Sequence, residues 1–553
     1  MSIPNFTFGT SINTRGTGKF KQKRDVIGFR MRCNIRRIFT FAFVAFGATL
    51  VLLSLPRDNF GREWDEAPRS SESQFLAANR RDSGLRPAMV GPQMSFQKQP
   101  NPPSLIRKEI EEDPFDFPSH VNRVVLNKLY NFLKGRDLLA MAASECHENS
   151  TLAEYWMKTK QKSVPTRDSW ERFYAQIGTC GVYSDDKTVD DLLTDLNRAT
   201  IKAVHIMDGG TQAKLVFTFE NDKQAVFKPM RFGRDYESDP NHFYFSDFER
   251  HNAEIATFHL DRVLGFRRAV PTVGRIVNIT SELYDKAEKK LKKTFFISPA
   301  KNRCFVSRCD YYCDTTHAIC GLPDLKEGSV QVFLPDEGVV PRRHNRSPYR
   351  RTYSKKNQIA EWQSDMNYCT DKVKVKKQYA HGRKLLDLVD LHILDYLIGN
   401  QDRHHYESFA VFENLPSYAI HLDNGRAFGR TDIDDDDIIL PLRQCCVIRP
   451  STLNTLLQFY SQPQALTKTL HASLIKDPVA PILAYKHYVA IERRLGKLME
   501  FILECFKQKP VERILITEFH NANVPEANVE EEERSEEETG DKKEDKKNSH
   551  IVR

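Results

Sequence analysis

Runs of apolar residues divide this chain of 553 residues into segments of different character. Residues 38–55 form an uncharged run of 18 residues, IFTFAFVAFGATLVLLSL, close to the roughly 20 apolar residues that cross a bilayer. Because Arg36 and Arg37 precede it, this run predicts a transmembrane signal anchor with residues 1–37 in the cytosol and the body in a lumen. The alternative is a signal peptide, or an anchor that is cleaved later, and either sends the body into the secretory pathway.

The segments that flank the body lack a regular apolar pattern. Residues 56–120 are rich in Arg, Ser, Pro, Gln and Asn, which predicts a flexible lumenal stem. Residues 526–553 are dominated by acidic residues, which predicts a disordered tail. Helical spacing of apolar residues begins at Val121 and continues to Phe132.

Within the body, the pattern predicts a hairpin and two helices. Two β-type runs, 214–219 and 224–227, flank a turn at Asn221-Asp222. Residues 246–265 have the apolar spacing of an amphipathic helix that ends at Gly265. Residues 384–399 predict a strongly apolar second helix.

The distribution of charge argues against a nucleic-acid-coating protein. The chain has 82 Lys and Arg against 74 Asp and Glu, a net charge of +8. Residues 1–37 alone contain nine basic residues and one acidic residue, so residues 38–553 sum to zero. A nucleic-acid surface would need its basic excess on the folded body, so no nucleic-acid partner is expected.

The cysteines agree with a lumenal body. Of eleven cysteines, Cys33 precedes the anchor and ten follow it, an even number that indicates up to five disulfides in an oxidising compartment. The cluster formed by Cys304, Cys309, Cys313 and Cys320 could alternatively hold zinc, but a lumenal location favours disulfides. Asn149 and Asn278 lie in glycosylation sequons.

Four polar residues stand in an order that is typical of phosphoryl transfer. Lys228 ends a β-type run, Glu249 lies on the predicted helix, Asp402 follows the apolar helix, and Asp423 follows a short hydrophobic stretch. Phosphoryl transfer requires a cation on the phosphates, a carboxylate that places it, a carboxylate-bound metal and an acceptor for the hydroxyl proton. Protein kinases use a strand Lys, a helix Glu, a loop Asp and a second Asp in this order.

The pattern departs from that of ordinary kinases in several places. The loop reads Asp402-Arg-His-His rather than His-Arg-Asp, Glu407 occupies the position of the loop Asn, and Asp423-Asn-Gly replaces Asp-Phe-Gly. Gly209-Gly210 is the only glycine pair before the Lys strand. Each feature alone also fits a solvated lysine or a helix cap, and the prediction depends on their order.

Longer stretches resemble one family. Residues 243–256 (FYFSDFERHNAEIA), 294–300 (TFFISPA), 402–407 (DRHHYE), 421–426 (HLDNGR) and 444–446 (QCC) resemble the secretory-pathway kinases of family with sequence similarity 20, which include a Golgi casein kinase and a glycosaminoglycan xylosylkinase. The first two stretches look more like the casein kinase branch. The resemblance implies an α+β fold of atypical bilobal kinase type, disulfide-stabilised, with an N-terminal extension and β-rich lobe over 121–335 and a mainly helical lobe over 336–525.

The resemblance also implies roles for individual residues. Gln212 and Lys228 would contact the phosphates of ATP, and Glu249 would bind metal and help to position Lys228. Asp402 would be the catalytic base, Glu407 would contact nucleotide, and Asp423 would bind nucleotide and metal, which is Mn²⁺ with Mg²⁺ as the alternative. The adenine pocket would be lined by Gln331, Val332, Phe333 and Leu334.

The same resemblance implies four disulfides, and the even cysteine count suggests a fifth. The implied pairs are Cys304–Cys320, Cys309–Cys313, Cys369–Cys445 and Cys446–Cys505. The count alone then leaves Cys146 to pair with Cys180.

Substrate and partner expectations follow from the casein kinase branch. It implies phosphorylation of Ser in acidic Ser-x-Glu segments of secreted proteins, in the Golgi lumen or after secretion, with a second copy or a related pseudokinase as partner. A basic run is either a guide for such substrates or a solvated loop; it contains Arg342, Arg343, Arg346, Arg350 and Arg351. The acidic run of residues 434–437 matches no calcium-loop spacing, which predicts a solvated loop. The alternatives are a xylose kinase of the same family, a non-catalytic pseudokinase-like activator, and a disulfide-rich adhesion module.

Overall fold

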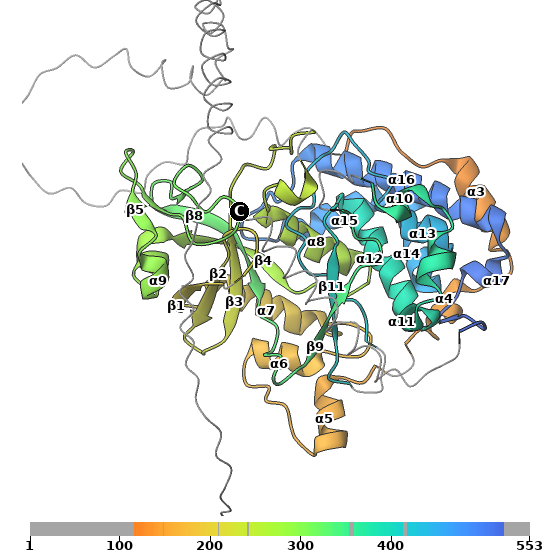
Figure 1. The fold of residues 1–553 in the computed structure, drawn as a ribbon, viewed down its shortest axis with the longest axis horizontal. Helices are drawn as coiled ribbons and strands as arrows, with labels where there is room; N and C mark the ends of the chain where they lie inside the picture. The colour runs from red at the N-terminus through yellow and green to blue at the C-terminus, as the bar shows by residue number, and fades with distance from the viewer. Residues whose placement is uncertain are drawn as a thin grey trace, which may run out of the picture. The chain divides into compact units, whose positions relative to one another are not determined.

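The computed structural model describes residues 115–146, 149–207, 209–240, 243–352, 359–412 and 417–524. Side chains in these ranges form two hydrophobic cores, one built on a β-sheet and one on helices. Figure 1 shows the sheet toward one end of the molecule and most of the long helices toward the other. The predicted cytosolic tail, anchor and acidic tail lie outside the described residues. None of the helices in the described ranges is long and apolar enough to cross a membrane.

Five antiparallel strands make the principal sheet, in the order β1-β2-β3-β8-β4. Their bounds are β1 Ile201–Ile206, β2 Leu215–Phe219, β3 Gln224–Pro229, β8 Leu325–Val332 and β4 Thr272–Asn278. The predicted β2–β3 hairpin is confirmed. Asp222 adopts a left-handed φ of 59° in its turn, and Phe217 stacks on Phe227 with ring centroids 4.8 Å apart.

Three small sheets and a series of helices complete the fold. The small sheets are β5 (Phe295–Ile297) with β6 (Arg303–Phe305) and β7 (Ile319–Cys320), β9 (Arg342–Arg346) with β11 (His405–Phe409), and β10 (His381–Gly382) with β12 (Phe519–His520). The helices of the first half are α3 Arg123–Phe132, α4 Leu138–Ala142, α5 Leu152–Lys160, α6 Ser169–Gln176, α7 Asp186–Arg198, η3 Tyr244–Ser246, α8 His251–Val263, η4 Ile279–Tyr284 and α9 Lys289–Lys292. Those of the second half are α10 Glu361–Ser364, η5 Cys369–Val373, α11 Lys377–Ala380, α12 Lys384–Ile398, α13 Leu440–Cys445, α14 Pro450–Tyr460, α15 Ala465–Leu474, α16 Tyr485–Gln508 and α17 Val511–Ile514.

Helix α8 joins the two cores, because it is buried on nearly every side. Its Phe258 packs in the sheet core, whereas Ile255 and Leu260 pack in the helical core. The helix begins at His251, five residues later than its apolar spacing predicts. The backbone before it is held by tertiary hydrogen bonds instead: Gln212 accepts from the Glu249 amide and donates to the Asp247 carbonyl. The prediction that Glu249 lies on the helix is therefore wrong.

Helix α12 confirms the second predicted helix, and Gly399 ends it with a left-handed φ of 68°. The helix is wholly buried although it contains Asp387, Asp390 and Asp395. Arginines from four places satisfy these carboxylates. Arg383 and Arg403 flank the helix, whereas Arg268 and Arg449 come from distant segments. Buried charges require such partners, so the network fixes α12 against the rest of the helical core.

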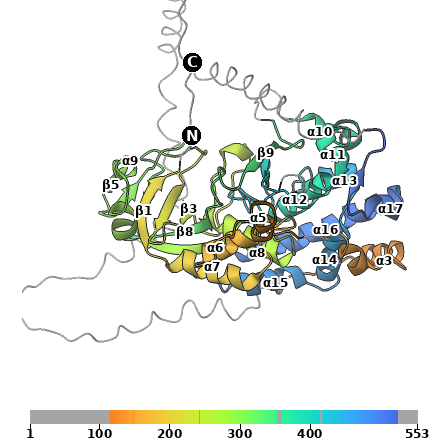
Figure 2. The ribbon, with the colours of Figure 1, turned by 90° about the horizontal axis from the view of Figure 1, so that it is seen from below.

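The N-terminal part of the described chain packs on the helical core. α3 forms as predicted, capped by Asn122, and contacts α16, which Figure 2 also shows. Phe115 and Phe117, which composition places in the stem, are only 9% exposed and join this core. The stem prediction is therefore wrong for these residues. The average composition of residues 56–120 is polar and does not reveal that two aromatic side chains at its end pack into the core.

Five disulfides link the ten cysteines in the described ranges, and they are the expected pairs: Cys146–Cys180, Cys304–Cys320, Cys309–Cys313, Cys369–Cys445 and Cys446–Cys505. Cys304 and its neighbours therefore do not form a zinc site. Two of the bridges connect segments far apart in the sequence, with separations of 76 and 59 residues, and both lie in the helical half.

Candidate active site

Lys228 is the centre of a buried cluster of charges between the sheet and α8. Its ammonium nitrogen lies 3.0 Å from Glu249 Oε2 and 3.3 Å from Asp423 Oδ1, and it donates a short hydrogen bond to Glu254. The side chain is 10% exposed. The strand, the segment before α8, α8 itself and the loop of Asp423 each supply one member, so the cluster exists only when both cores are assembled.

Lys214 completes the cluster from the start of β2. Its ammonium nitrogen is 3.8 Å from Glu249 Oε1 and 3.7 Å from Asp423 Oδ1. The pKa of the Asp423 carboxyl is held well below its usual range, chiefly by the charge of Lys214 and also by Lys228. Burial opposes ionisation of Glu249, but the same two lysines keep its pKa below the usual range. Both carboxylates are therefore charged at neutral pH.

The Asp423-Asn-Gly loop lies directly against Glu249. Asp423 has a left-handed φ of 56°, and its side chain is 56% exposed. A Cβ on Gly425 would lie 3.1 Å from the Cβ of Glu249, and the Gly425 carbonyl accepts from the Arg250 amide at 2.6 Å. Glycine at this position permits the close approach that places the two carboxylates beside the same lysines.

Asp402 is positioned by the loop that follows α12. Its amide donates to Asn400 Oδ1 at 3.1 Å, and the guanidinium of Arg403 binds both oxygens of buried Asp395 at 2.8 Å. Arg403 also donates to Asn424 Oδ1 at 2.7 Å, which ties this loop to the Asp423 loop. Asp402 raises the pKa of His404 above its ordinary value, although burial of the ring opposes this.

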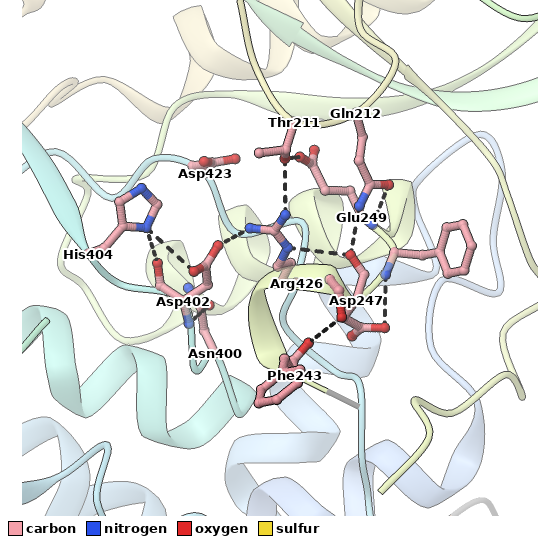
Figure 3. Close-up of polar contacts among 12 residues, drawn as sticks. Thr211, Gln212, Phe243, Asp247, Glu249, Asn400, Asp402, His404, Asp423 and Arg426 are labelled. Atoms are coloured by element: carbon pink, nitrogen blue, oxygen red, sulfur yellow. Dashed lines mark hydrogen bonds and ion pairs between the residues drawn. The ribbon is translucent and has the colours of Figure 1, made fainter. Parts of the chain in front are cut away.

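Arg426 bridges Asp402 to the lysine cluster. Its guanidinium forms a short ion pair with Asp402 and donates to Thr211 Oγ1 at 3.0 Å. Thr211 in turn donates to Glu249 Oε1 at 3.4 Å. Figure 3 shows this chain of contacts, with Asp423 beside it. Asp402 also borders a hollow whose lining includes Tyr244, Gln401 and Arg430, where an acceptor hydroxyl could approach it.

The site contains oxygen ligands that suit a hard divalent cation, but not a complete protein cage. Among the described residues, no group of three or more His, Cys, Asp or Glu side chains could hold a metal. Glu249 and Asp423 instead face the same ammonium groups, so a cation held by these two carboxylates would need further ligands from a substrate. Mg²⁺ and Mn²⁺ bind nucleotide phosphates in this shared way.

The remaining predicted nucleotide residues lie on or beside strands β8 and β11 or before β2. Gln331 and Val332 end β8, Val332 and Leu334 are buried, and the Phe333 amide and carbonyl are hydrogen-bonded to Gln224 and Tyr174. Glu407 lies on β11 and accepts from Arg342 Nε at 2.8 Å. Gln212 binds the backbone of residues 247 and 249, so here its amide positions Glu249.

Parts of the basic run and of the acidic run form ion pairs that stabilise the fold. Arg342 pairs with Glu407 and Glu337, and Arg351 pairs with Asp435. Asp434 is 3% exposed and binds both Arg493 and Arg494 of α16. The prediction of a solvated loop is therefore wrong for Asp434 and Asp435, because they pair with arginines from distant segments that the local sequence does not reveal. The side chains of Asp436 and Asp437 are 40% and 39% exposed.

Sequence reasoning missed three members of the site. Lys214 carries no motif signal of its own. Arg426 ends the HLDNGR stretch that carries the resemblance, but no role is implied for it there. Glu254, five residues after Glu249, is the glutamate that lies on α8, and it also contacts Lys228.

A strand lysine paired to a helix glutamate, a loop aspartate and a second aspartate beside the lysine define a phosphotransferase of protein-kinase type. Residues 168–514 match the family model described as Golgi casein kinase, C-terminal, Fam20. The chain belongs to this Fam20 kinase family, and its mixed helices and sheets with several disulfides are the fold that the resemblance implies.

Individual relatives and a solved structure agree with this family assignment. The chain is 68% identical to the extracellular serine/threonine protein kinase CeFam20 of Caenorhabditis elegans, over 94% of this chain and 100% of that one. It is 44% identical to the human extracellular serine/threonine protein kinase FAM20C, over 67% of this chain and 63% of that one. A crystal structure of the Golgi casein kinase with Mn/ADP bound superposes with a TM-score of 0.73 at 72% identity, over 75% of this chain and 97% of that one. Proteins named pseudokinase and glycosaminoglycan xylosylkinase also match.

Proposed function

We propose that this chain is a secretory-pathway protein kinase that transfers the γ-phosphoryl group of ATP to Ser in Ser-x-Glu segments of secreted proteins. The observation that carries the proposal is the contact of Lys228 with both Glu249 and Asp423, while Arg426 links the same cluster to Asp402. Phosphate-binding and base groups are thereby brought to one site.

Each residue has a separate task in this proposal. Lys228 and Lys214 neutralise phosphate oxygens, and Glu249 and Asp423 hold Mn²⁺, with Mg²⁺ as the alternative. The metal, when bound, screens the charge that develops on the transferred group. Asp402 accepts the proton of the attacking serine hydroxyl, and its loop is fixed by Arg403 through Asp395. Val332 and Leu334 line the adenine pocket, and Glu407 contacts the nucleotide.

The proposed location is supported by the sequence and by relatives that are named extracellular kinases. Residues 38–55 anchor the chain as a type II membrane protein of the Golgi, with cleavage and secretion as a later step, and Asn149 and Asn278 carry glycans. Five disulfides support an oxidising compartment. Relatives named pseudokinase support a related chain, besides a second copy, as a partner.

The test uses the purified full chain with labelled ATP and Mn²⁺. One acceptor is a Ser-x-Glu peptide, a second has Gln in place of Glu, and a third is a xylose-containing tetrasaccharide. Label on the Ser-x-Glu peptide, reduced on the Gln peptide and lost in Asp423→Ala, is expected. Label on the sugar alone would assign the chain to the xylose kinases, and binding of ATP without transfer would make it a pseudokinase-like activator.

A further inference from the structure

A lysine-rich surface surrounds α9, at the end of the molecule away from the helical core (Figures 1 and 2). We define the α9 basic surface as six exposed residues of this region: Lys286, Lys289, Lys290, Lys293, Lys301 and Arg308. Residues 285–308 contain eight basic and two acidic residues, whereas residues 38–553 together sum to zero. The positive charge of the body is therefore concentrated in this short segment.

The surface rests on a well-anchored platform. Leu291 in α9 is fully buried in the sheet core. The ring of Tyr284 contacts two cations: its centroid is 4.5 Å from the Lys292 ammonium and 4.1 Å from the Arg303 guanidinium. These contacts occupy two of the eight basic side chains and fix the backbone that presents the other six.

The six outward bases have no acidic partners in the described part of the chain. None of them forms an ion pair with another described residue, and neither do Asp285 and Glu288, the two acids of the segment. This contrasts with the active site, where each lysine faces two or three carboxylates. A dense set of unpaired like charges destabilises a fold by self-repulsion, so its presence points to an external counter-charge.

The chemistry of the surface selects among polyanions. A hollow here is lined by four basic side chains and one threonine: Lys289, Lys290, Lys293, Arg308 and Thr294. It lacks the aromatic anchors on which protein interfaces centre, and its cationic groups suit a polyanion. Lysine acts as a point charge, whereas planar bidentate recognition of carboxylates favours arginine. Lysine-rich segments of this length are typical of polyanion patches.

We propose that the α9 basic surface binds a sulfated glycosaminoglycan, at a site separate from the catalytic centre. The choice of glycan rests on the lumenal location given above, since anionic lipids concentrate in the cytoplasmic leaflet and nucleic acids are absent from the lumen. The choice of glycan does not depend on whether the chain is a kinase.

The surface also lies one loop away from the active site. Arg308 precedes the Cys309–Cys313 loop, in which the Tyr311 amide donates to the Thr211 carbonyl at 2.8 Å. Tyr312 of the same loop stacks on Phe248 with centroids 4.0 Å apart, directly before Glu249. A kinase held on a sulfated glycan through α9 would therefore keep its catalytic site close to proteins that carry the glycan.

The test measures binding of the full chain to an immobilised heparin oligosaccharide over a range of salt concentrations. The variant Lys289→Glu/Lys290→Glu/Lys293→Glu is expected to bind at least about tenfold more weakly than the parent, with a smaller salt dependence. The control Lys128→Glu/Lys134→Glu/Lys476→Glu changes the net charge equally at exposed lysines outside the surface and is expected to bind like the parent.

Several outcomes would overturn the proposal. Equal loss in the test and control variants would mean that only net charge matters. Loss on Arg343→Glu/Arg346→Glu, with binding retained in the α9 variant, would move the site to β9. Equal binding of desulfated heparin, or stronger binding of polyglutamate, would exclude sulfate as the ligand. Peptide phosphorylation by the α9 variant is expected to equal that of the parent, so failure of glycan binding and failure of the kinase proposal are measured separately.

Discussion

Lys228 on β3 donates a hydrogen bond to Glu254 on α8, whereas Glu249, which also contacts this lysine, lies before the helix. The two glutamates therefore contact the same ammonium group, one from a helix and the other from the segment that precedes it. Glu254 is 2% exposed and also accepts from the Asn424 amide at 3.3 Å, so it faces the protein interior. Glu249 contacts Lys214 and Thr211 and lies beside Asp423, so it faces the proposed metal.

Substitution of each glutamate should separate positioning of Lys228 from metal binding. Glu249→Gln should raise the Mn²⁺ concentration for half-maximal activity by about tenfold or more, because metal ligands must be anionic. Glu254→Gln should leave that concentration within about twofold and lower kcat/KM for ATP by about tenfold to a hundredfold, because Lys228 loses its fixed geometry. Steady-state kinetics with Mn²⁺ titration measure both. Similar Mn²⁺ shifts in the two variants would contradict the division of roles.

Removal of the proposed base should affect chemistry without affecting nucleotide binding. Asp402→Asn should lower kcat by about 10²- to 10⁴-fold, because the serine proton loses its acceptor. Binding of ADP with Mn²⁺, measured by calorimetry, should stay within about threefold. Asp423→Asn is the matched control, since it should weaken that binding strongly. Retained turnover in Asp402→Asn would place the base elsewhere.

Lys214 should set the acid limit of the activity. Its charge is the largest cause of the lowered pKa of Asp423 and also lowers that of Glu249. Lys214→Met should raise both pKa values, so that these carboxylates are protonated at higher pH and release metal there. The acid limb of kcat/KM against pH is then expected to move upward by roughly one pH unit. Lys286→Met, at an exposed lysine, should leave the limb unchanged.

How much the sequence could predict depends on the range of each interaction. The periodicity of apolar residues and the residues that favour turns or helix ends are local signals. They therefore predict the β2–β3 hairpin and α12, which ends at Gly399. The order of the motifs also predicts Lys228, Asp402 and Asp423 as site residues, because protein kinases use a lysine and two aspartates in this order along the chain. Lys214 carries no such signal, and its contact with Asp423 joins residues more than two hundred positions apart.

Burial of charge was the least predictable feature. Asp387 and Asp390 in α12 read as polar interruptions of an apolar helix, yet both are nearly fully buried beside Arg449. Glu249 was placed on a helix because its surroundings have helical spacing, but the side chain of Gln212 takes the backbone hydrogen bonds that such a helix would need. In each case a partner from a distant segment decided the outcome.

The ionised side chain of Asp434 should stabilise the fold at neutral pH, and this contribution should be lost over a defined range of acidic pH. Burial opposes its ionisation, but the hydrogen bond from Arg493 and the charge of Arg494 lower its pKa to about 2 from an ordinary 3.8. A lowered folded-state pKa stabilises the fold above the unfolded value and loses that effect as pH falls, here between about 4 and 2. The shift corresponds to roughly 2 kcal/mol in the free energy of unfolding.

The variant Asp434→Asn tests this contribution. It should lower the free energy of unfolding by about 2–4 kcal/mol at pH 7, because buried Arg494 loses its counter-charge. Urea denaturation measures the difference, which should stay constant from pH 7 to about 4 and shrink as pH falls toward 2. Asp432→Asn is the control, since that side chain is 58% exposed and pairs only at the surface, and it should cost about 0.5 kcal/mol or less. A difference that persists unchanged at pH 2 would show that Asp434 acts through packing rather than charge.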